Sequence, residues 1–321
     1  MEFVFKQFDV VKEVSDHHFT NDKSRKKQKK SFSYNGKYPQ FYTKIMREWK
    51  ILEKNLPESI YVQVYETSID LIRAAIIGPP GTPYHDGLYF FDIFLPMEYP
   101  EMPPKVHYHS YGYNLNPNLY SRGFVCLSLI NTWRGDNVEK WRKNQSTLLQ
   151  LLVSIQGLVL NDKPYFNEPG REVGISSDDP KWIKRCQSYN ESVFVLACRT
   201  MARTLRKPPE NFEAIVAQHF RDRGECILAA VKAYRRGRCP IGQFHESECG
   251  REGGLRSVRP VSEGFKYKLK IAEKELKDSL RRLKVHPGWE CRSASRAGKA
   301  TARKKRYWVL SWVCFLFREN K

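Results

Sequence analysis

Hydrophobic and polar residues follow two different rhythms along the chain, and the switch between them predicts where helices and strands lie. Over residues 38–56 the apolar positions recur every three or four residues, which places them on one helical face. Pro57 ends this helix. Four short apolar runs follow, separated by turn signals. The runs are 61–66, 71–77, 88–95 and 105–109. Their close spacing predicts a four-stranded antiparallel meander.

The helical rhythm returns after the meander. Helices are predicted at 146–158, 180–204 and 209–236, where a proline opens the second helix and a Pro-Pro pair precedes the third. A charged segment at 264–285 has leucines near helical spacing and is predicted to be a single solvated helix. A helix, a meander, an irregular stretch and further helices together indicate an α+β fold.

These patterns divide the chain into four segments. Residues 37–205 form the predicted core, and 206–236 form a C-terminal helical extension. Residues 1–36 are polar and basic and are predicted to be a disordered arm. Residues 237–321 are predicted to be a basic linker and tail, disordered outside the solvated helix. The apolar run at 307–317 is too short to span a bilayer, so we interpret it as a non-native terminus in preference to an interfacial anchor.

The formal net charge is +20, but most of it lies outside the predicted core, since residues 237–321 carry 21 Lys and Arg against 9 Asp and Glu. A basic balance is compatible with nucleic acid, acidic membranes or acidic proteins as partners. No RNP, zinc-finger or helix-turn-helix signature accompanies the charge, which argues against a nucleic-acid-binding protein. Residues 23–30 hold six basic side chains in eight positions and are interpreted as solvated, with a nuclear localisation signal as the alternative.

The eight cysteines show neither a CxxC pair nor the spacing of a structural zinc site. Most are expected to be small buried hydrophobic residues. No signal peptide opens the chain, so a reducing cytosolic or nuclear compartment is expected.

Cys126 differs from the other cysteines because of its neighbours. It follows Asn118 by eight residues, and Asn118 lies on a turn stiffened by Pro117. A thiolate can attack a carbonyl carbon to form a thioester, while an asparagine amide can steady the loop or the developing oxyanion. The pattern therefore predicts acyl transfer through a thioester on Cys126.

The run Asn116-Pro117-Asn118, with Tyr120, Gly123 and Val125-Cys126-Leu127 after it, resembles the active-site segment of ubiquitin-conjugating enzymes. That family carries His-Pro-Asn, a Tyr two residues on, a Gly and Val-Cys-Leu. Asn116 in place of His narrows the resemblance to the large conjugating enzymes with Asn-Pro-Asn, and is expected to alter how the loop is held. The supporting matches are the segments 78–87, 95–106, 148–158 and 164–169. Further features resemble plant members of the hybrid group that combines conjugating enzyme (E2) and ligase (E3).

The resemblance covers about residues 37–235 and implies the ubiquitin-conjugating (UBC) fold. It implies that Cys126 accepts ubiquitin from the activating enzyme (E1) and passes it to lysines of protein substrates. It implies no cofactor, because the upstream activating enzyme consumes the ATP. Asn118 would anchor the loop and stabilise the oxyanion.

Asn167 occupies the position where many relatives carry an acidic residue that orients and deprotonates the incoming lysine. Glu168 follows it and could supply that carboxylate instead, or both could be polar loop residues without a role. At the positions where small family members dock RING ligases, this chain has Glu101 and Arg142-Lys143. Transfer without a separate RING ligase is therefore expected, with an E3 partner as the alternative.

Two other functions fit the same resemblance. The chain could be a catalytically silent ubiquitin-binding scaffold, although such variants typically lack the cysteine that this chain keeps. It could also conjugate another ubiquitin-like modifier, since the fold would be identical. The Asn-Pro-Asn pattern and the extension over 131–141 favour ubiquitin.

Overall fold

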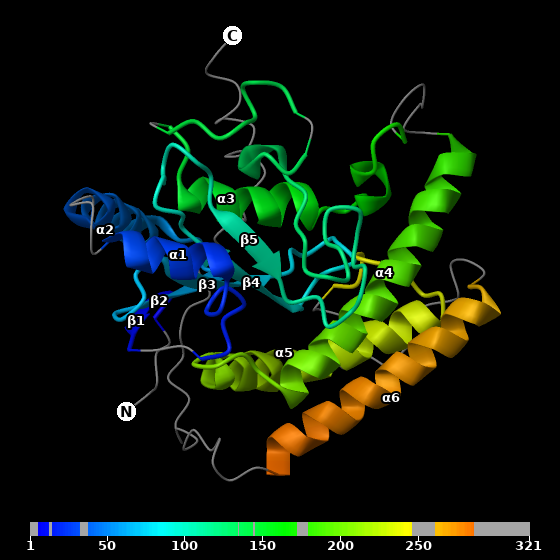
Figure 1. The fold of residues 1–321 in the computed structure, drawn as a ribbon. Helices are drawn as coiled ribbons and strands as arrows, with labels where there is room; N and C mark the ends of the chain where they lie inside the picture. The colour runs from blue at the N-terminus through cyan, green and yellow to red at the C-terminus, as the bar shows by residue number, and fades with distance from the viewer. Residues whose placement is uncertain are drawn as a thin grey trace.

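The computed structural model describes residues 6–12, 15–32, 38–133, 135–143, 145–171, 179–245 and 261–285. A five-stranded sheet in the order β1-β2-β3-β4-β5 forms its centre (Figure 1). The strands are β1 (Phe8–Val11), β2 (Ile60–Tyr65), β3 (Leu71–Ile77), β4 (Leu88–Phe94) and β5 (Lys105–Tyr108). Strands β2 to β5 pair antiparallel in sequence order, whereas β1 pairs parallel to β2 at the edge of the sheet.

Helices cover both faces of this sheet (Figure 1). The α-helices of the described residues are α1 (Lys23–Phe32), α2 (Tyr38–Asn55), α3 (Leu148–Ser154), α4 (Pro180–Arg206), α5 (Glu213–Arg235) and α6 (Glu263–Val285). Helix α3 starts at a complete capping box, in which Thr147 and Gln150 bond each other's backbone N–H groups, and it continues as one π-helical turn over Ile155–Val159. The predicted α+β order is confirmed, and so is the antiparallel meander within it.

Helices α2 and α3 cover one face of the sheet. Because strand side chains alternate between faces, every second residue of β2, β3 and β4 points into this layer. The resulting main core takes Phe41, Ile45 and Leu52 from α2. From the strands it takes Val62, Val64, Ile72, Ala74, Ile76, Tyr89, Phe91 and Ile93.

Helices α4, α5 and α6 cover the opposite face. Ala75, Leu88 and Phe90 point into this second layer and are at most 1% exposed. Phe90 meets Phe212, at the start of α5, edge to face with ring centroids 5.2 Å apart. The sheet is therefore buried on both faces by the chain's own helices.

The prediction that residues 1–36 form a disordered arm is wrong for the described part of that segment, which contains β1 and α1. The charge run misled the prediction because one of its basic residues, Arg25, faces inward. The Arg25 guanidinium bonds the Asp70 carboxylate through both oxygens, at 2.6 and 2.9 Å, and both side chains are buried. This pair attaches α1 to the turn between β2 and β3.

The prediction of a solvated helix at 264–285 is correct in secondary structure and wrong in environment. Helix α6 packs along α4 and α5, and its four leucines are buried. They are Leu269, Leu276, Leu280 and Leu283. The prediction of a disordered tail is therefore wrong for residues 263–285. The apolar run at 307–317 lies outside the described residues. None of the helices in the described part of the chain is long and apolar enough to cross a membrane.

Candidate active site

The segment that carries Cys126 folds as an irregular hairpin between β5 and α3. Isolated bridges join Leu119 to Val125 and His107 to Phe124, so the hairpin lies against the edge of β5. Gly123 sits at the turn with φ of +82°, and a Cβ there would lie 2.0 Å from the His107 ring. Only glycine meets both the conformation and the close approach.

Asn116 ties this hairpin to two other parts of the fold. Its Nδ2 donates to the Tyr84 hydroxyl at 3.0 Å and to the Val159 carbonyl at 2.9 Å. Its Oδ1 accepts the backbone N–H of Asn118 at 2.8 Å. The asparagine that replaces the family's histidine thus holds the loop through three buried hydrogen bonds.

Asn118 and Cys126 contact each other directly. The Cys126 N–H donates to the Asn118 carbonyl at 2.9 Å, and the Asn118 Nδ2 donates to the Cys126 carbonyl at 2.9 Å. The Asn118 Oδ1 is buried without a hydrogen-bond partner. An amide nitrogen carries two hydrogens, and the second makes no hydrogen bond within the described ranges. Two residues that are eight positions apart are therefore joined by two hydrogen bonds, which we call the clamp. The second N–H of the Asn118 amide remains unused in it.

Cys126 is buried, with the residue 5% exposed. Burial raises the pKa of this thiol, because it penalises the charged thiolate. A side-chain hydrogen bond from Tyr120 lowers the thiol pKa, and the Glu168 carboxylate raises it by repulsion. The net shift is upward, so the resting thiol keeps its proton more firmly than a free cysteine does.

Thr132 braces the other side of the nucleophile, and sequence reasoning missed it. Its Oγ1 accepts the Leu127 N–H at 2.9 Å and lies 2.8 Å from the Val125 carbonyl, to which it donates. The backbone on both sides of Cys126 is thus held by one hydroxyl. The residue before it, Asn131, could have indicated the tight turn that brings Thr132 back to Cys126. Asn131 has a left-handed conformation with φ of 59° and ends the 3₁₀ turn Ser128–Ile130.

The structure separates the two candidate residues of the exit loop. Asn167 Oδ1 accepts from Asn161 Nδ2 at 2.6 Å, and Asn167 Nδ2 donates to the Val159 carbonyl at 3.3 Å. Each end of its amide therefore has one partner, Asn161 for the oxygen and Val159, at the end of the π-helical turn, for the nitrogen. Glu168, in contrast, is close enough to raise the pKa of both the Cys126 thiol and the Tyr120 phenol. Of the two residues, Glu168 is the one whose charge acts on the thiol.

The position expected for ligase docking is polar. Glu101 forms an exposed ion pair with Lys44 of α2, with 3.2 Å between Nζ and Oε2. Trp141 packs into the main core and donates its indole N–H to the Pro100 carbonyl at 2.7 Å. No group of three or more His, Cys, Asp or Glu side chains in the described part of the chain is arranged to hold a metal ion.

A sequence profile described as "Ubiquitin-conjugating enzyme" matches residues 44–178, which include the whole hairpin. The chain is 51% identical over 239 residues to "Probable ubiquitin-conjugating enzyme E2 24" of Arabidopsis thaliana, covering 74% of this chain and 25% of that protein. It is 45% identical over 268 residues to "Putative ubiquitin-conjugating enzyme E2 39" of the same plant, covering 83% and 79%.

A more distant match is "Dual E2 ubiquitin-conjugating enzyme/E3 ubiquitin-protein ligase BIRC6" of Homo sapiens, 36% identical over 185 residues, or 55% of this chain and 4% of that protein. The chain spans less than half the length of four Arabidopsis relatives that it matches. The profile match and the relatives identify the sheet with α2 and α3 as the UBC fold. The chain belongs to the ubiquitin-conjugating enzyme family.

Proposed function

We propose that this chain accepts ubiquitin from E1 as a thioester on Cys126 and transfers it to lysines of substrate proteins. The observation that carries the proposal is the clamp between Asn118 and Cys126, because it places a nucleophile and an unused amide donor together in the family-matched region. A ubiquitin-like modifier other than ubiquitin is the alternative. The free thiol that this chemistry needs fits a reducing cytosolic or nuclear compartment.

Loading is a thioester exchange. The Cys126 thiol loses its proton as Sγ attacks the carbonyl carbon of the E1–ubiquitin thioester. The new Sγ–C bond forms, the old C–S bond breaks, and the E1 thiolate leaves and takes up a proton. The Tyr120 hydrogen bond stabilises the Cys126 thiolate during this step.

Discharge is the attack of a substrate lysine on the Cys126 thioester. A neutral lysine amine attacks the carbonyl carbon, and the charge on the resulting oxyanion meets the second N–H of Asn118. Collapse breaks the C–Sγ bond, forms the isopeptide bond and returns a proton to the thiolate. The Glu168 carboxylate acts electrostatically on the thiol, and we assign it the role of taking the proton from the amine. Asn167 supports the exit loop that carries Glu168.

We further propose that transfer needs no separate RING ligase. Two observations support this: the Lys44–Glu101 ion pair makes the expected docking position polar, and a human relative is named as a dual E2/E3 enzyme. Both ubiquitin-loading and substrate choice would then reside in one protein.

A thioester assay tests the main proposal. Purified protein is mixed with E1, ubiquitin and ATP, and analysed on a gel with and without reductant. We expect a ubiquitin-sized upshift that disappears with reductant and with Cys126→Ala. Cys126→Ser should give an upshift that resists reductant, because an oxyester has a poorer leaving group. Loading with another modifier instead would identify a different conjugation pathway. Failure with all modifiers would leave a binding scaffold and refute the proposal.

A further inference from the structure

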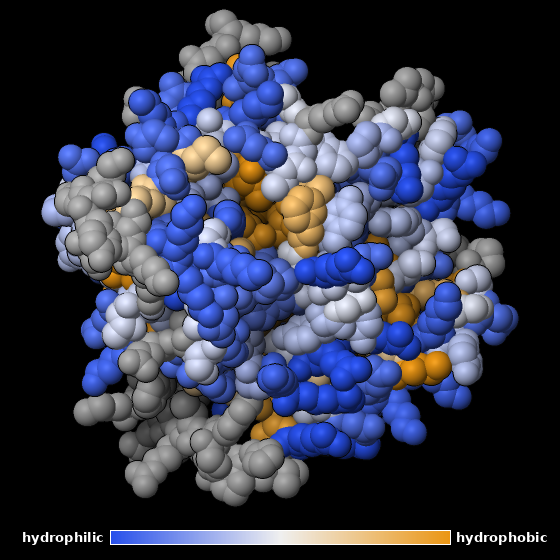
Figure 2. All heavy atoms as spheres, in the orientation of Figure 1, coloured by the Kyte–Doolittle hydropathy of each residue, from blue (hydrophilic) through white to orange (hydrophobic). Residues whose placement is uncertain are grey.

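A groove of about 1080 Å³ lies beside the candidate active site, along β5. Figure 2 shows an orange hollow at this position, surrounded by blue hydrophilic residues. The apolar lining includes Phe19, Phe94, Val106, Phe124 and Ile130. A space of this size matches the pockets in which proteins hold ligands or side-chain clusters.

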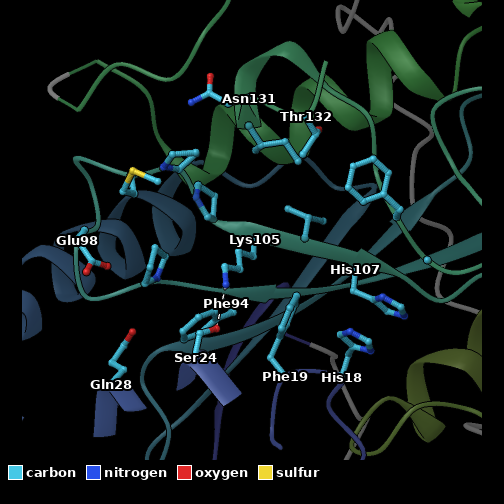
Figure 3. A pocket seen from close by; sticks show the side chains of 18 of the residues that line it. His18, Phe19, Ser24, Gln28, Phe94, Glu98, Lys105, His107, Asn131 and Thr132 are labelled. Carbon is cyan, nitrogen blue, oxygen red and sulfur yellow. Dashed lines mark hydrogen bonds between the residues drawn. The ribbon is translucent and has the colours of Figure 1, made fainter. Parts of the chain in front are cut away.

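The N-terminal segment builds one wall of the groove. Its His18 ring stacks on His107 of β5 with centroids 3.5 Å apart, and the two rings lie side by side in Figure 3. The backbone N–H of His18 also donates to the buried Asp92 carboxylate at 2.7 Å. With the Arg25–Asp70 pair at the start of α1, these contacts fix the wall, so the groove exists before anything binds it.

The opposite wall is the hairpin that carries Cys126. Phe124 lines the groove and is 50% exposed. Val125 is 1% exposed and belongs to the main core. Because side chains alternate in an extended segment, Phe124 and Cys126 project on the side opposite to Val125. Two residues of extended chain correspond to about 6–7 Å. A segment that rests on Phe124 is therefore within a few residues of the nucleophile.

The charges that line the groove are mainly basic. Lys27, Lys105 and Arg122 line it, against Glu98 as the acidic side chain. Lys27 and Arg122 form no ion pair with any residue that the structure describes, so their charge is available to a partner. Lys105 Nζ donates to Ser24 Oγ at 2.9 Å and lies over the Phe94 ring. An apolar floor with a basic rim complements an acidic segment that carries an apolar side chain.

The geometry points to an acceptor-docking groove, which binds an extended segment of the substrate protein. That segment carries an apolar anchor residue flanked by acidic residues, with the target lysine within about four residues of the anchor. This inference rests on the proposed function, because an acceptor segment held beside Cys126 presents its lysine to the thioester there. The substrate class is therefore lysine in an acidic, apolar-anchored sequence.

Synthetic peptides test the groove. One peptide carries a phenylalanine flanked by aspartates and a single lysine three residues further on; a matched peptide has arginines in place of the aspartates. Binding to the unloaded protein is measured by fluorescence anisotropy. Transfer is then measured as discharge of the preformed ubiquitin thioester to each peptide and to free lysine. Free lysine reports the chemistry without the groove.

We expect the acidic peptide to bind and to accept ubiquitin about tenfold better than the matched peptide, a size that two or three exposed ion pairs produce together. The double variant Lys27→Glu/Arg122→Glu should abolish or invert this preference. Lys50→Glu changes an exposed lysine of α2, away from the groove lining, and is the matched control that should keep the preference.

Equal binding of the two peptides by the unloaded wild-type protein would overturn the inference, and so would a preference that survives the double variant. Failure of the protein to load ubiquitin would refute the proposed function instead, and the anisotropy measurement would still decide whether the groove binds acidic segments. A preference in binding without a preference in transfer would show a docking site for another partner and would overturn the acceptor role.

Discussion

Asn118→Ala separates the two roles that the clamp at Cys126 allows. The substitution removes the Nδ2 donor to the Cys126 carbonyl, a bond of 2.9 Å between buried groups. It also removes the second N–H, which we assign to the oxyanion of the discharge step. The two losses differ in size and in the step that they affect.

The loop contribution is modest. Losing one hydrogen bond costs about 1 kcal/mol, and leaving the buried carbonyl without a partner raises this to about 1–3 kcal/mol. Such a change lowers the free energy of unfolding, and any displacement of the loop that follows acts on loading and discharge alike. Losing an oxyanion donor costs about 100-fold to 1000-fold, and we assign this donor to the discharge step, in which a substrate amine attacks the Cys126 thioester.

We therefore expect Asn118→Ala to slow loading by about tenfold or less and to slow discharge to free lysine by about 100-fold or more. Both rates are measured by single-turnover gel assays, with loading completed before a pulse–chase discharge. Asn114→Ala is the matched control, because Asn114 Oδ1 bonds the Ser121 N–H of the same hairpin at 2.6 Å but does not contact Cys126. Equal losses in the two steps would refute the oxyanion role and leave Asn118 as a loop anchor alone.

Three further predictions test groups around the sheet and the thiol. Tyr120→Phe should raise the pKa of the Cys126 thiol, because the phenol donates the hydrogen bond that lowers it; an unchanged pH midpoint of iodoacetamide alkylation would contradict this. Arg25→Ala should leave Asp70 buried without a partner, cost about 3–5 kcal/mol and speed hydrogen exchange over residues 15–32, whereas unchanged exchange would show that α1 is held elsewhere. Burial lowers the pKa of His17 to about 4, so the folded state keeps this ring neutral and the free energy of unfolding should fall by about 3 kcal/mol as pH drops from about 6.5 to about 4. In His17→Gln, urea denaturation should show a flatter pH dependence, and an identical slope would refute that assignment.

The elements with strong periodicity could be predicted from sequence to within one or two residues. Helix α2 and strands β2 to β4 have continuous apolar patterns bounded by turn residues, and these patterns depend on the local chain alone. Strand β1 has only four residues, and it forms because β2 offers it an edge. The sequence of helix α1 predicts a solvated segment, because the contact between Arg25 and Asp70 joins residues that are 45 positions apart. No local pattern indicates such a contact.

The candidate site shows the same division. The fixed spacing of Asn118 and Cys126 within one hairpin makes their proximity predictable. The hydrogen bonds of Thr132 depend on the backbone turn at Asn131. The influence of Glu168 on the thiol depends on where the exit loop lies. The groove depends on three segments that meet only in the folded protein. None of these has a local signature, because each is set by tertiary packing.

The second helical layer has a consequence for the size of the smallest viable protein. The profile-matched region ends at residue 178, but Ala75, Leu88 and Phe90 are covered by helices that begin at residue 180. A premature stop codon or a protease cut near residue 178 would bare an apolar sheet face, which favours aggregation. Such a fragment would keep every candidate catalytic residue and still be a substrate for quality-control machinery. A chain that contains the candidate active site alone is thus insufficient for a stable protein. Helices α4, α5 and α6 must be present as well.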